Sequence, residues 1–100
     1  MIGYVTVSDL EGGERIAKVL VTEKLAVCVN VIPSISSTYR FKGKIEKESE
    51  SIMVIKTDET LKQRLTVRIK ELHSYDVPEI LYWKVDASLE INQWLTDELS

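Results

Sequence analysis

The feature that most constrains the fold is the stretch Ala26–Thr57, nearly a third of the chain, which has the pattern of one long β-hairpin. Apolar side chains recur at its odd positions: Val27, Val29, Val31, Ile35, Tyr39 and Phe41. Beyond Pro33, polar side chains fill the even positions: Ser34, Ser36, Thr38 and Arg40. This period of two is typical of a strand with one covered face. At the tip, Gly43 follows Lys42 and supplies the positive φ that a tight turn needs.

The returning arm of the hairpin changes character along its length. Residues 46–50 (EKESE) are too polar to be buried. Residues 52–55 (IMVI), in contrast, are apolar at odd and even positions alike, as in a strand covered on two faces. The inner half of the hairpin therefore belongs to a core, and the outer half projects beyond it with one apolar face. Because the chain is too short to cover that face, we expect other copies of it to do so.

The composition, with 44% hydrophobic and 29% charged residues, is typical of a single globular domain, which we expect to span residues 1–100. The net charge of −3 argues against a general nucleic-acid-binding protein. No cationic start precedes a long apolar run, so we expect neither a signal peptide nor a membrane span. Cys28 is the only cysteine, which excludes an intrachain disulfide and favours a reducing cytoplasm.

The elements outside the hairpin are expected to be two further strands and three helices. Ile2–Val7 is an apolar, β-branched run typical of a buried strand. Ser8 and Glu11 match a capping box for a first helix that ends near Leu25. The second helix follows residues 57–59 (TDE), and its apolar positions are Leu61, Leu65, Ile69 and Leu72. The last strand is expected over Glu79–Val85, after Pro78, and a final helix is capped by Asp86 or Ser88.

This order, β-α-β-β-α-β-α, predicts an α+β fold of the ferredoxin-like split β-α-β type, with a long hairpin and an extra C-terminal helix. The four strands form one antiparallel sheet, and two helices cover one face. The C-terminal helix and neighbouring subunits are the candidates to cover the other face. RNA-recognition domains share this topology, but the expected central strand, residues 51–57 (SIMVIKT), lacks the aromatic side chains on which they stack bases.

The chain contains few thiol or imidazole side chains that could act as nucleophiles or as soft-metal ligands. His73 and Cys28 are the only histidine and cysteine, and they come from different elements. A packed strand thiol is the default for Cys28, and His73 has a structural alternative to ligation, the capping of free carbonyls at a helix end. A structural zinc site needs four Cys or His ligands, so a soft-metal site must recruit carboxylates or a second subunit. Residues 11–15 (EGGER) indicate an acid-rich helix start rather than a phosphate loop.

Three motifs resemble those of the CutA divalent-cation-tolerance proteins. Residues 27–33 (VCVNVIP) and 37–45 (STYRFKGKI) are similar to A-C-V-N-I-I-P…S-x-Y-x-W-x-G-K-I, and residues 70–80 (KELHSYDVPEI) are similar to K-x-L-H-P-Y-x-V-P-E-I. Residues 14–20, 23–26 and 94–95 also correspond, so the resemblance covers essentially the whole chain. It implies a homotrimer in which the hairpins pair with neighbouring subunits, a role in tolerance to divalent metals, copper especially, and no established catalytic activity.

The chain departs from this family at the positions that matter for copper. Some bacterial members have a cysteine late in the first strand and a His-His pair, both implicated in copper binding. These positions correspond to Val5 and to Leu72 and His73, so only one imidazole remains. Affinity for transition metals follows ligand softness and geometry, and we therefore expect weak or assembly-dependent binding of Cu²⁺ or another divalent cation.

The polar residues that remain within family-like motifs supply the candidate sites. For a metal they are His73 and Glu79, with Cys28 as a weak third ligand. For a ligand cleft between subunits they are Lys56, His73, Tyr75, Glu79, Tyr39 and Asn30. The alternative is that Tyr75 and Glu79 only hydrogen-bond the turn into the last strand.

The expectation that follows is a cytoplasmic, non-enzymatic homotrimer of the CutA type, linked to divalent-metal homeostasis and bound to neither nucleic acid nor membrane. The alternative is a PII-like regulatory or scaffold trimer that binds a small anion or a partner protein in its intersubunit clefts.

Overall fold

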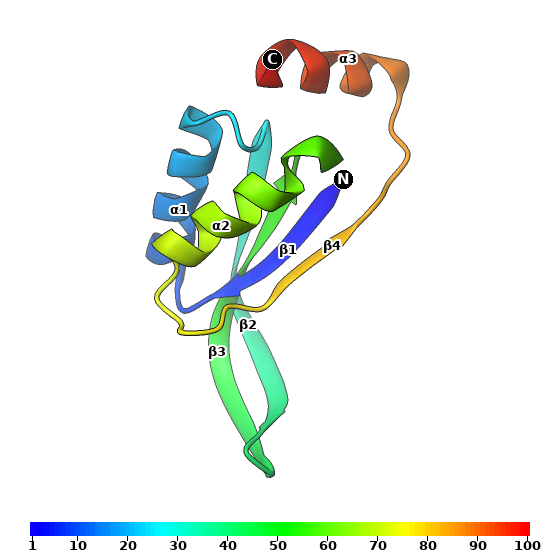
Figure 1. Cartoon of the computed structure of the whole chain (residues 1–100). Helices are drawn as coiled ribbons and strands as arrows, with labels where there is room; N and C mark the ends of the chain where they lie inside the picture. The colour runs from blue at the N-terminus through cyan, green and yellow to red at the C-terminus, as the bar shows by residue number, and fades with distance from the viewer.

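Two helices pack on one face of a four-stranded antiparallel sheet in the computed structural model, which describes residues 1–100 (Figure 1). The strands are β1 (Ile2–Val7), β2 (Cys28–Phe41), β3 (Lys44–Lys56) and β4 (Ile80–Trp83), in the order β2-β3-β1-β4. The helices are α1 (Leu10–Thr22), α2 (Lys62–Leu72) and α3 (Leu89–Leu99). The α+β fold, the four-stranded antiparallel sheet and the hairpin turn at Lys42 and Gly43 are confirmed.

The core lies between the sheet and the two helices α1 and α2. It consists of Val5, Val7, Ile16, Leu20, Leu25, Ala26, Met53, Ile55, Leu65 and Ile69. Gly13 lets α1 approach the sheet closely, because a Cβ atom there would lie 2.9 Å from Cγ1 of Val31. Burial of these apolar side chains supplies the main driving force for the fold.

The ends of the first helix and the last strand differ from the predicted ones. Asp9, not Ser8, caps α1, and its Oδ1 accepts a 2.7 Å hydrogen bond from the Gly12 amide. The helix ends at Thr22 rather than near Leu25, because the chain turns at Lys24, whose φ is +59°. Strand β4 stops at Trp83 rather than Val85, because Trp83 pairs with Ile2, where β1 begins.

The other boundaries lie close to the predicted ones. A 3₁₀ turn, Glu59–Leu61, precedes α2, and Asp58 accepts a hydrogen bond of 2.9 Å from the Thr60 amide at its start. Ser88 rather than Asp86 caps α3, since the Oγ atom of Ser88 accepts a 3.3 Å hydrogen bond from the Ile91 amide.

A bulge in β2 overturns the prediction that the odd positions share one face along the whole strand. Val31 opposes Met53 and faces the helices, but Ile35 opposes Glu50, because one extra residue lies between Ile32 and Ile35. The insertion is accommodated at Pro33, which has no amide hydrogen, and at Ser34, whose φ is +59°. From Ile35 onward the odd positions therefore lie on the opposite face of the sheet.

That opposite face, which we call the open face, has no covering layer within the chain. It includes Ile35, Tyr39 and Phe41 on β2 and also Tyr4, Ile52, Val54, Leu81 and Trp83. Phe41 is 56% exposed, Leu81 51% and Trp83 48%. The strand Ile52–Ile55, predicted to be covered on two faces, is thus covered on one: Met53 and Ile55 are buried, whereas Ile52 and Val54 are only half-buried.

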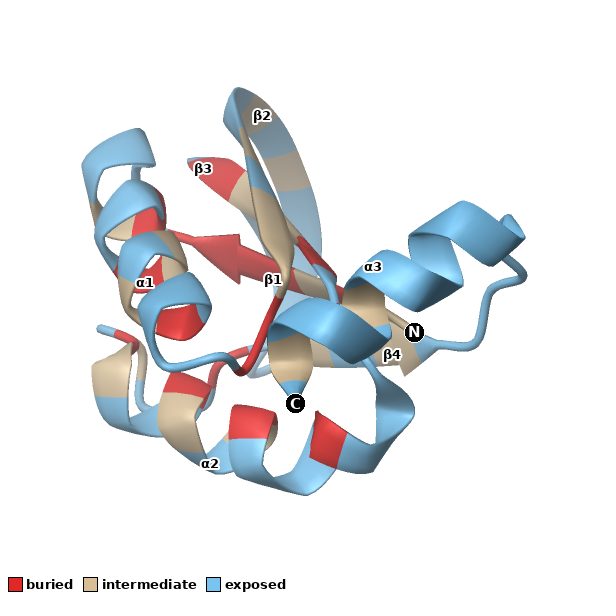
Figure 2. Cartoon of the chain, turned by 90° about the horizontal axis from the view of Figure 1, so that it is seen from above, coloured by how far each residue is buried: buried red, intermediate tan, exposed pale blue.

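Helix α3 does not cover the open face. It follows an extended segment after β4 and lies over the end of the sheet where β1 begins, with no buried residue of its own (Figures 1 and 2). Leu89 and Trp94 on it are 84% and 41% exposed. None of the three helices combines the length and apolar character needed to span a bilayer. The hairpin projects from the other end, and the molecule measures 45 Å along its long axis against 24 and 23 Å across it.

Candidate functional site

His73 lies between the end of α2 and the end of β1, and both of its ring nitrogens are engaged. Nδ1 accepts a 3.0 Å hydrogen bond from the Tyr75 amide, so Nε2 carries the proton and donates at 2.7 Å to the carbonyl oxygen of Thr6. The residue is 9% exposed. This arrangement fixes the neutral Nε2-protonated tautomer and ties the α2–β4 connection to β1, so His73 bridges two backbone segments.

Tyr75 and Glu50 form a partly buried pair at the base of the hairpin. The Tyr75 hydroxyl donates a 2.7 Å hydrogen bond to Oε2 of Glu50, and the Tyr75 ring lies against His73 with 4.6 Å between ring centroids. Burial and the neighbouring Glu50 carboxylate raise the pKa of Tyr75 well above its usual range. The hydroxyl therefore stays protonated at physiological pH and remains a donor.

Glu50 contradicts the prediction that residues 46–50 are too polar to be buried, since it is only 8% exposed. It lies on the open face of β3 just beyond Ser51, which pairs with the last residue of β1, and Tyr75 reaches it from the α2–β4 connection. The alternation along β3 contains this information, because Glu46, Glu48 and Glu50 occupy even positions and so lie on the same face of the strand as Ile52 and Val54.

Tyr39 extends this group of polar side chains along the projecting hairpin. Its hydroxyl donates a 2.9 Å hydrogen bond to Oε1 of Glu48, one position on the same face beyond Glu50. This hydrogen bond and the nearby carboxylates raise the pKa of the Tyr39 hydroxyl. Of the residues proposed for a ligand cleft, His73 and Tyr75 are thus in direct contact, and Tyr39 lies farther along the hairpin on the face that carries Glu48 and Glu50.

The other candidates lie elsewhere. Asn30 and Lys56 share the open face near the end of the sheet where β1 begins, with Cys28 directly opposite Lys56 in the ladder. Asn30 and Lys56 are exposed, and Cys28 is half-buried. Glu79 is an exposed residue immediately before β4, at the end of the molecule from which the hairpin projects. A single chain therefore does not bring Lys56 and Asn30 together with His73 and Tyr75.

The proposed metal ligands do not fit one ion within a chain. Cys28 and His73 lie toward opposite ends of β1, since Cys28 is aligned through Lys56 with Ile2 whereas His73 contacts Thr6. No group of three or more His, Cys, Asp or Glu side chains converges anywhere in the structure. A tightly bound divalent cation needs several converging ligands, so a metal site on this chain requires groups from more than one copy.

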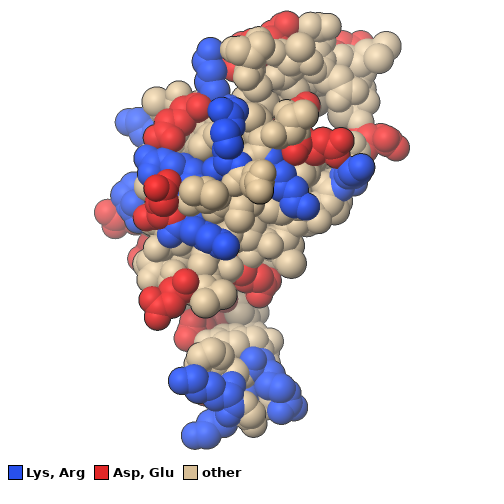
Figure 3. Space-filling model, viewed as in Figure 1, with Lys and Arg blue, Asp and Glu red and all other residues tan.

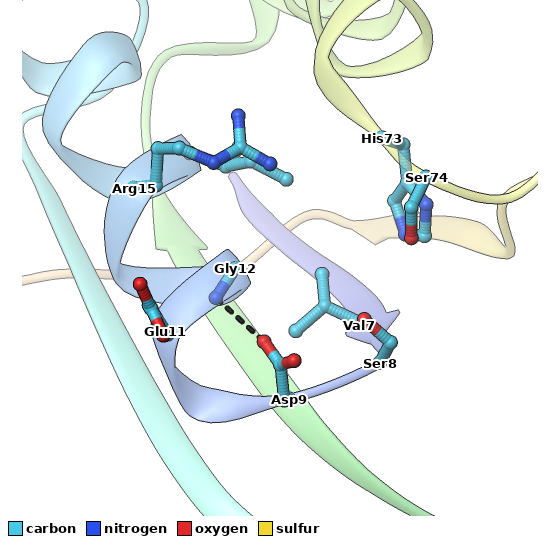
Figure 4. Close-up of a pocket in the computed structure, with 9 residues that line it drawn as sticks. Val7, Ser8, Asp9, Glu11, Gly12, Arg15, His73 and Ser74 are labelled. Atoms are coloured by element: carbon cyan, nitrogen blue, oxygen red, sulfur yellow. Dashed lines mark hydrogen bonds between the residues drawn. The ribbon is translucent and has the colours of Figure 1, made fainter.

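A shallow pocket of about 230 Å³ adjoins His73 at the start of α1 (Figure 4). Its lining includes Asp9, Glu11, Gly12, Arg15 and Ser74. The side chain of Asp9 occupies the helix start as its cap, which places a carboxylate where an anion would otherwise meet the free amides (Figure 4). This geometry agrees with the prediction that residues 11–15 are an acid-rich helix start rather than a phosphate loop.

Comparison with known proteins assigns the chain to a family. The family model described as CutA1 divalent ion tolerance protein matches residues 1–98. Among relatives, the chain is 39% identical over 99 residues to the divalent-cation tolerance protein CutA of Pyrococcus horikoshii, covering 98% of this chain and 96% of the relative. It is 41% identical over 96 residues to protein CutA 1, chloroplastic, of Oryza sativa, covering 95% of this chain but 54% of the relative.

The chain spans about half the length of the plant and animal relatives that it matches, including 44% of the Arabidopsis thaliana protein and 52% of the human one. Solved structures agree with the fold over almost the entire chain. The CutA1 structure from Oryza sativa superimposes with a TM-score of 0.94 at 39% identity, covering 99% of this chain and 92% of that one. The Thermus thermophilus structure gives 0.95 at 35% identity, covering 99% and 97%. The chain belongs to the CutA1 divalent ion tolerance family.

Proposed function

We propose that this protein is a homotrimer that acts in tolerance to divalent metal ions, copper among them, by binding the ions and without catalytic turnover. The observation that carries the proposal is the match of residues 1–98 to a family described by divalent ion tolerance, together with an open sheet face that the chain leaves uncovered. The reducing compartment favoured by the single cysteine makes the cytoplasm the proposed location.

The open face and the hairpin support the trimer. Exposed apolar patches of this kind mark association surfaces, and an arm that projects beyond its own core gains cover only from another chain. β4 and the outer half of β2 are the two edges of the sheet, so each presents unpaired backbone groups that can pair with a neighbouring copy. A ring of three copies related head to tail would use both edges in every subunit.

Metal binding, in this proposal, takes place at the boundary between subunits and is weak. Glu79 offers an exposed carboxylate, and Cys28 offers a half-buried thiol. His73 can ligate a metal only by giving up one of its two hydrogen bonds, which lowers the net gain from ligation. The chain alone does not bring three such ligands together, so this proposal requires assembly before a metal ion is bound.

Calorimetric titration of the assembled protein with Cu²⁺ tests the metal proposal. We expect weak uptake that is reduced in the variants His73→Gln and Glu79→Gln and unchanged in Glu71→Gln, which removes an exposed carboxylate from α2 as a control. Equal uptake by all four proteins, or no uptake at all, would contradict metal binding through these residues.

A second candidate function is a regulatory trimer that binds a small anion. It is favoured by Lys56, an exposed cation on the open face whose neighbours on that face, Asn30 and Cys28, carry no negative charge. Titration with inorganic phosphate discriminates the two readings, because uptake that is lost in Lys56→Gln without any response to Cu²⁺ would replace the metal proposal. A scaffold trimer that recruits a partner protein would respond to neither titration.

A further inference from the structure

The tip of the hairpin is a basic segment of a chain that is acidic overall. Four cationic residues, Arg40, Lys42, Lys44 and Lys47, lie within eight positions of the sequence, and all four are exposed. The only acidic residue among these positions is Glu46, whereas the whole chain carries a net charge of −3. Figure 3 shows these cations gathered on the part of the molecule that projects farthest from the body.

Acidic side chains lie at the lower end of the body, from which the hairpin leaves, as they do on other parts of the body (Figure 3). The connection between β1 and α1 carries Asp9, followed by Glu11 in the first turn of α1. The connection between α2 and β4 carries Asp76 and Glu79. All four are exposed, and we call them the acidic rim.

Within one chain the basic tip and the acidic rim do not meet. The ion pairs that the structure forms are Arg68 with Glu23, Arg68 with Glu71, and Lys84 with Glu59, none of which involves the tip or the rim. The tip is also a two-residue turn on a convex arm, so it cannot enclose a small anion. Its shape suits contact with a larger surface of opposite charge.

We propose that the basic tip of one copy docks on the acidic rim of a second copy and thereby fixes the orientation of neighbours in the ring. This inference rests on the proposed trimer. In a closed cyclic assembly every subunit has the same orientation relative to the axis, so with the hairpins directed along that axis each tip lies on the side of the ring where the neighbour's hairpin also leaves its body. That end of the body carries the acidic rim, while α3 lies at the far end (Figure 1).

The charge complementarity acts on orientation and on the rate and salt dependence of assembly, while burial of the open face supplies most of the affinity. Exposed ion pairs of this kind are screened over about 8 Å at physiological salt, so their contribution should fade as salt is added. The open face then holds the trimer together, with less selectivity for the correct orientation.

The double variant Lys42→Glu/Lys44→Glu tests the proposal, with Arg64→Glu/Lys70→Glu on α2 as a control of equal charge change. Arg64 and Lys70 are exposed residues of the helical layer, away from the open face. In sedimentation equilibrium at low salt we expect the tip variant to dissociate at roughly tenfold higher protein concentration than wild type and control. The difference should shrink at high salt, and adding Asp76→Lys/Glu79→Lys to the tip variant should restore assembly in part.

Carbodiimide cross-linking, which joins lysine amines to carboxylates, tests the docking surface directly. Isotope-labelled and unlabelled chains that have been refolded together should give mixed cross-links between the tip peptide and the peptides that carry the acidic rim.

Two results with a trimeric wild type would overturn this inference and leave the proposed trimer intact. In one, the tip variant dissociates no more readily than the control; in the other, the mixed cross-links do not include the tip peptide. The inference would also be overturned if the wild type binds anionic vesicles or heparin and the tip variant loses this binding while it stays fully trimeric. That result would assign the tip to an anionic partner outside the trimer. A monomeric wild type would instead remove the trimer on which the inference rests.

Discussion

The hydroxyl of Tyr75 lies 2.7 Å from Oε2 of Glu50 and joins the α2–β4 connection to the base of the projecting hairpin. The same connection is held to β1 through His73, whose Nε2 lies 2.7 Å from the Thr6 carbonyl oxygen. Two hydrogen bonds from residues close together in the sequence thus fasten the place where the hairpin leaves the core. These contacts hold the α2–β4 connection against the base of the hairpin.

Replacing Tyr75 by Phe should destabilise the protein by about 1 to 3 kcal/mol, because the buried Glu50 carboxylate loses its donor. The matched control is Tyr39→Phe, which removes an exposed hydroxyl from Glu48 and should change the free energy of unfolding by less than about 0.5 kcal/mol. Urea unfolding at one fixed protein concentration measures both variants. Equal effects of the two substitutions would contradict the importance of the Tyr75–Glu50 pair.

The same pair predicts a response to alkaline pH. The pKa of Tyr75 is raised in the folded protein, so its contribution to stability is complete below the unfolded value of about 10 and is lost as pH rises above it. The difference in stability between wild type and Tyr75→Phe should therefore stay constant from neutral pH to about pH 9 and narrow above about pH 10. A difference that narrows already in the neutral range would show that another group controls it.

Replacing His73 by Ala should lower stability by about 2 to 4 kcal/mol, because the variant leaves the Thr6 carbonyl and the Tyr75 amide without partners and opens a cavity. His73→Gln should lose less, since the glutamine side-chain amide can still donate to the carbonyl of Thr6. The comparison uses urea unfolding under the conditions given for Tyr75. If His73→Ala is no less stable than His73→Gln, the hydrogen bonds of the ring contribute little to the fold.

Deleting Ser34 should leave assembly intact. The deletion removes the extra residue of the bulge, so Pro33 would oppose Ser51 while Ile35 still opposes Glu50, and Ile35, Tyr39 and Phe41 stay on the open face. The control Ser34→Gly keeps the residue count and suits the φ of +59°, so its assembly should also match wild type. Light scattering gives the mass of each variant, and circular dichroism checks that each is folded. A deletion variant that is folded but monomeric would contradict this prediction.

Much of the architecture was predictable because its signals are local. The alternation within Ala26–Thr57 and the turn at Gly43 predict the hairpin, and the apolar spacing of residues 61–72 predicts α2. The bulge was not predictable from alternation alone, because the odd positions stay apolar on both sides of Pro33 even though the face changes between them. Asp9 displaced Ser8 as the helix cap through a shift of a single residue, which lies within the ambiguity of capping signals.

The site depended on tertiary contacts that no local pattern contains. His73 was predicted either to cap a helix end or to bind a metal, but its partner is a carbonyl on β1, 67 residues away in the sequence. Glu50 was predicted to be exposed because its neighbours are charged, and it is buried because Tyr75 closes over it. Tyr75 and His73 lie close together in the motif of residues 70–80, and their rings are also neighbours in the structure.

The mass of the protein in solution tests the central claim most directly. Size-exclusion chromatography with light scattering at micromolar concentration should report a single species of three times the 11.4 kDa chain mass. A well-behaved monomer of 11.4 kDa would contradict the account, because the open face would then be stable in water without a second chain to cover it.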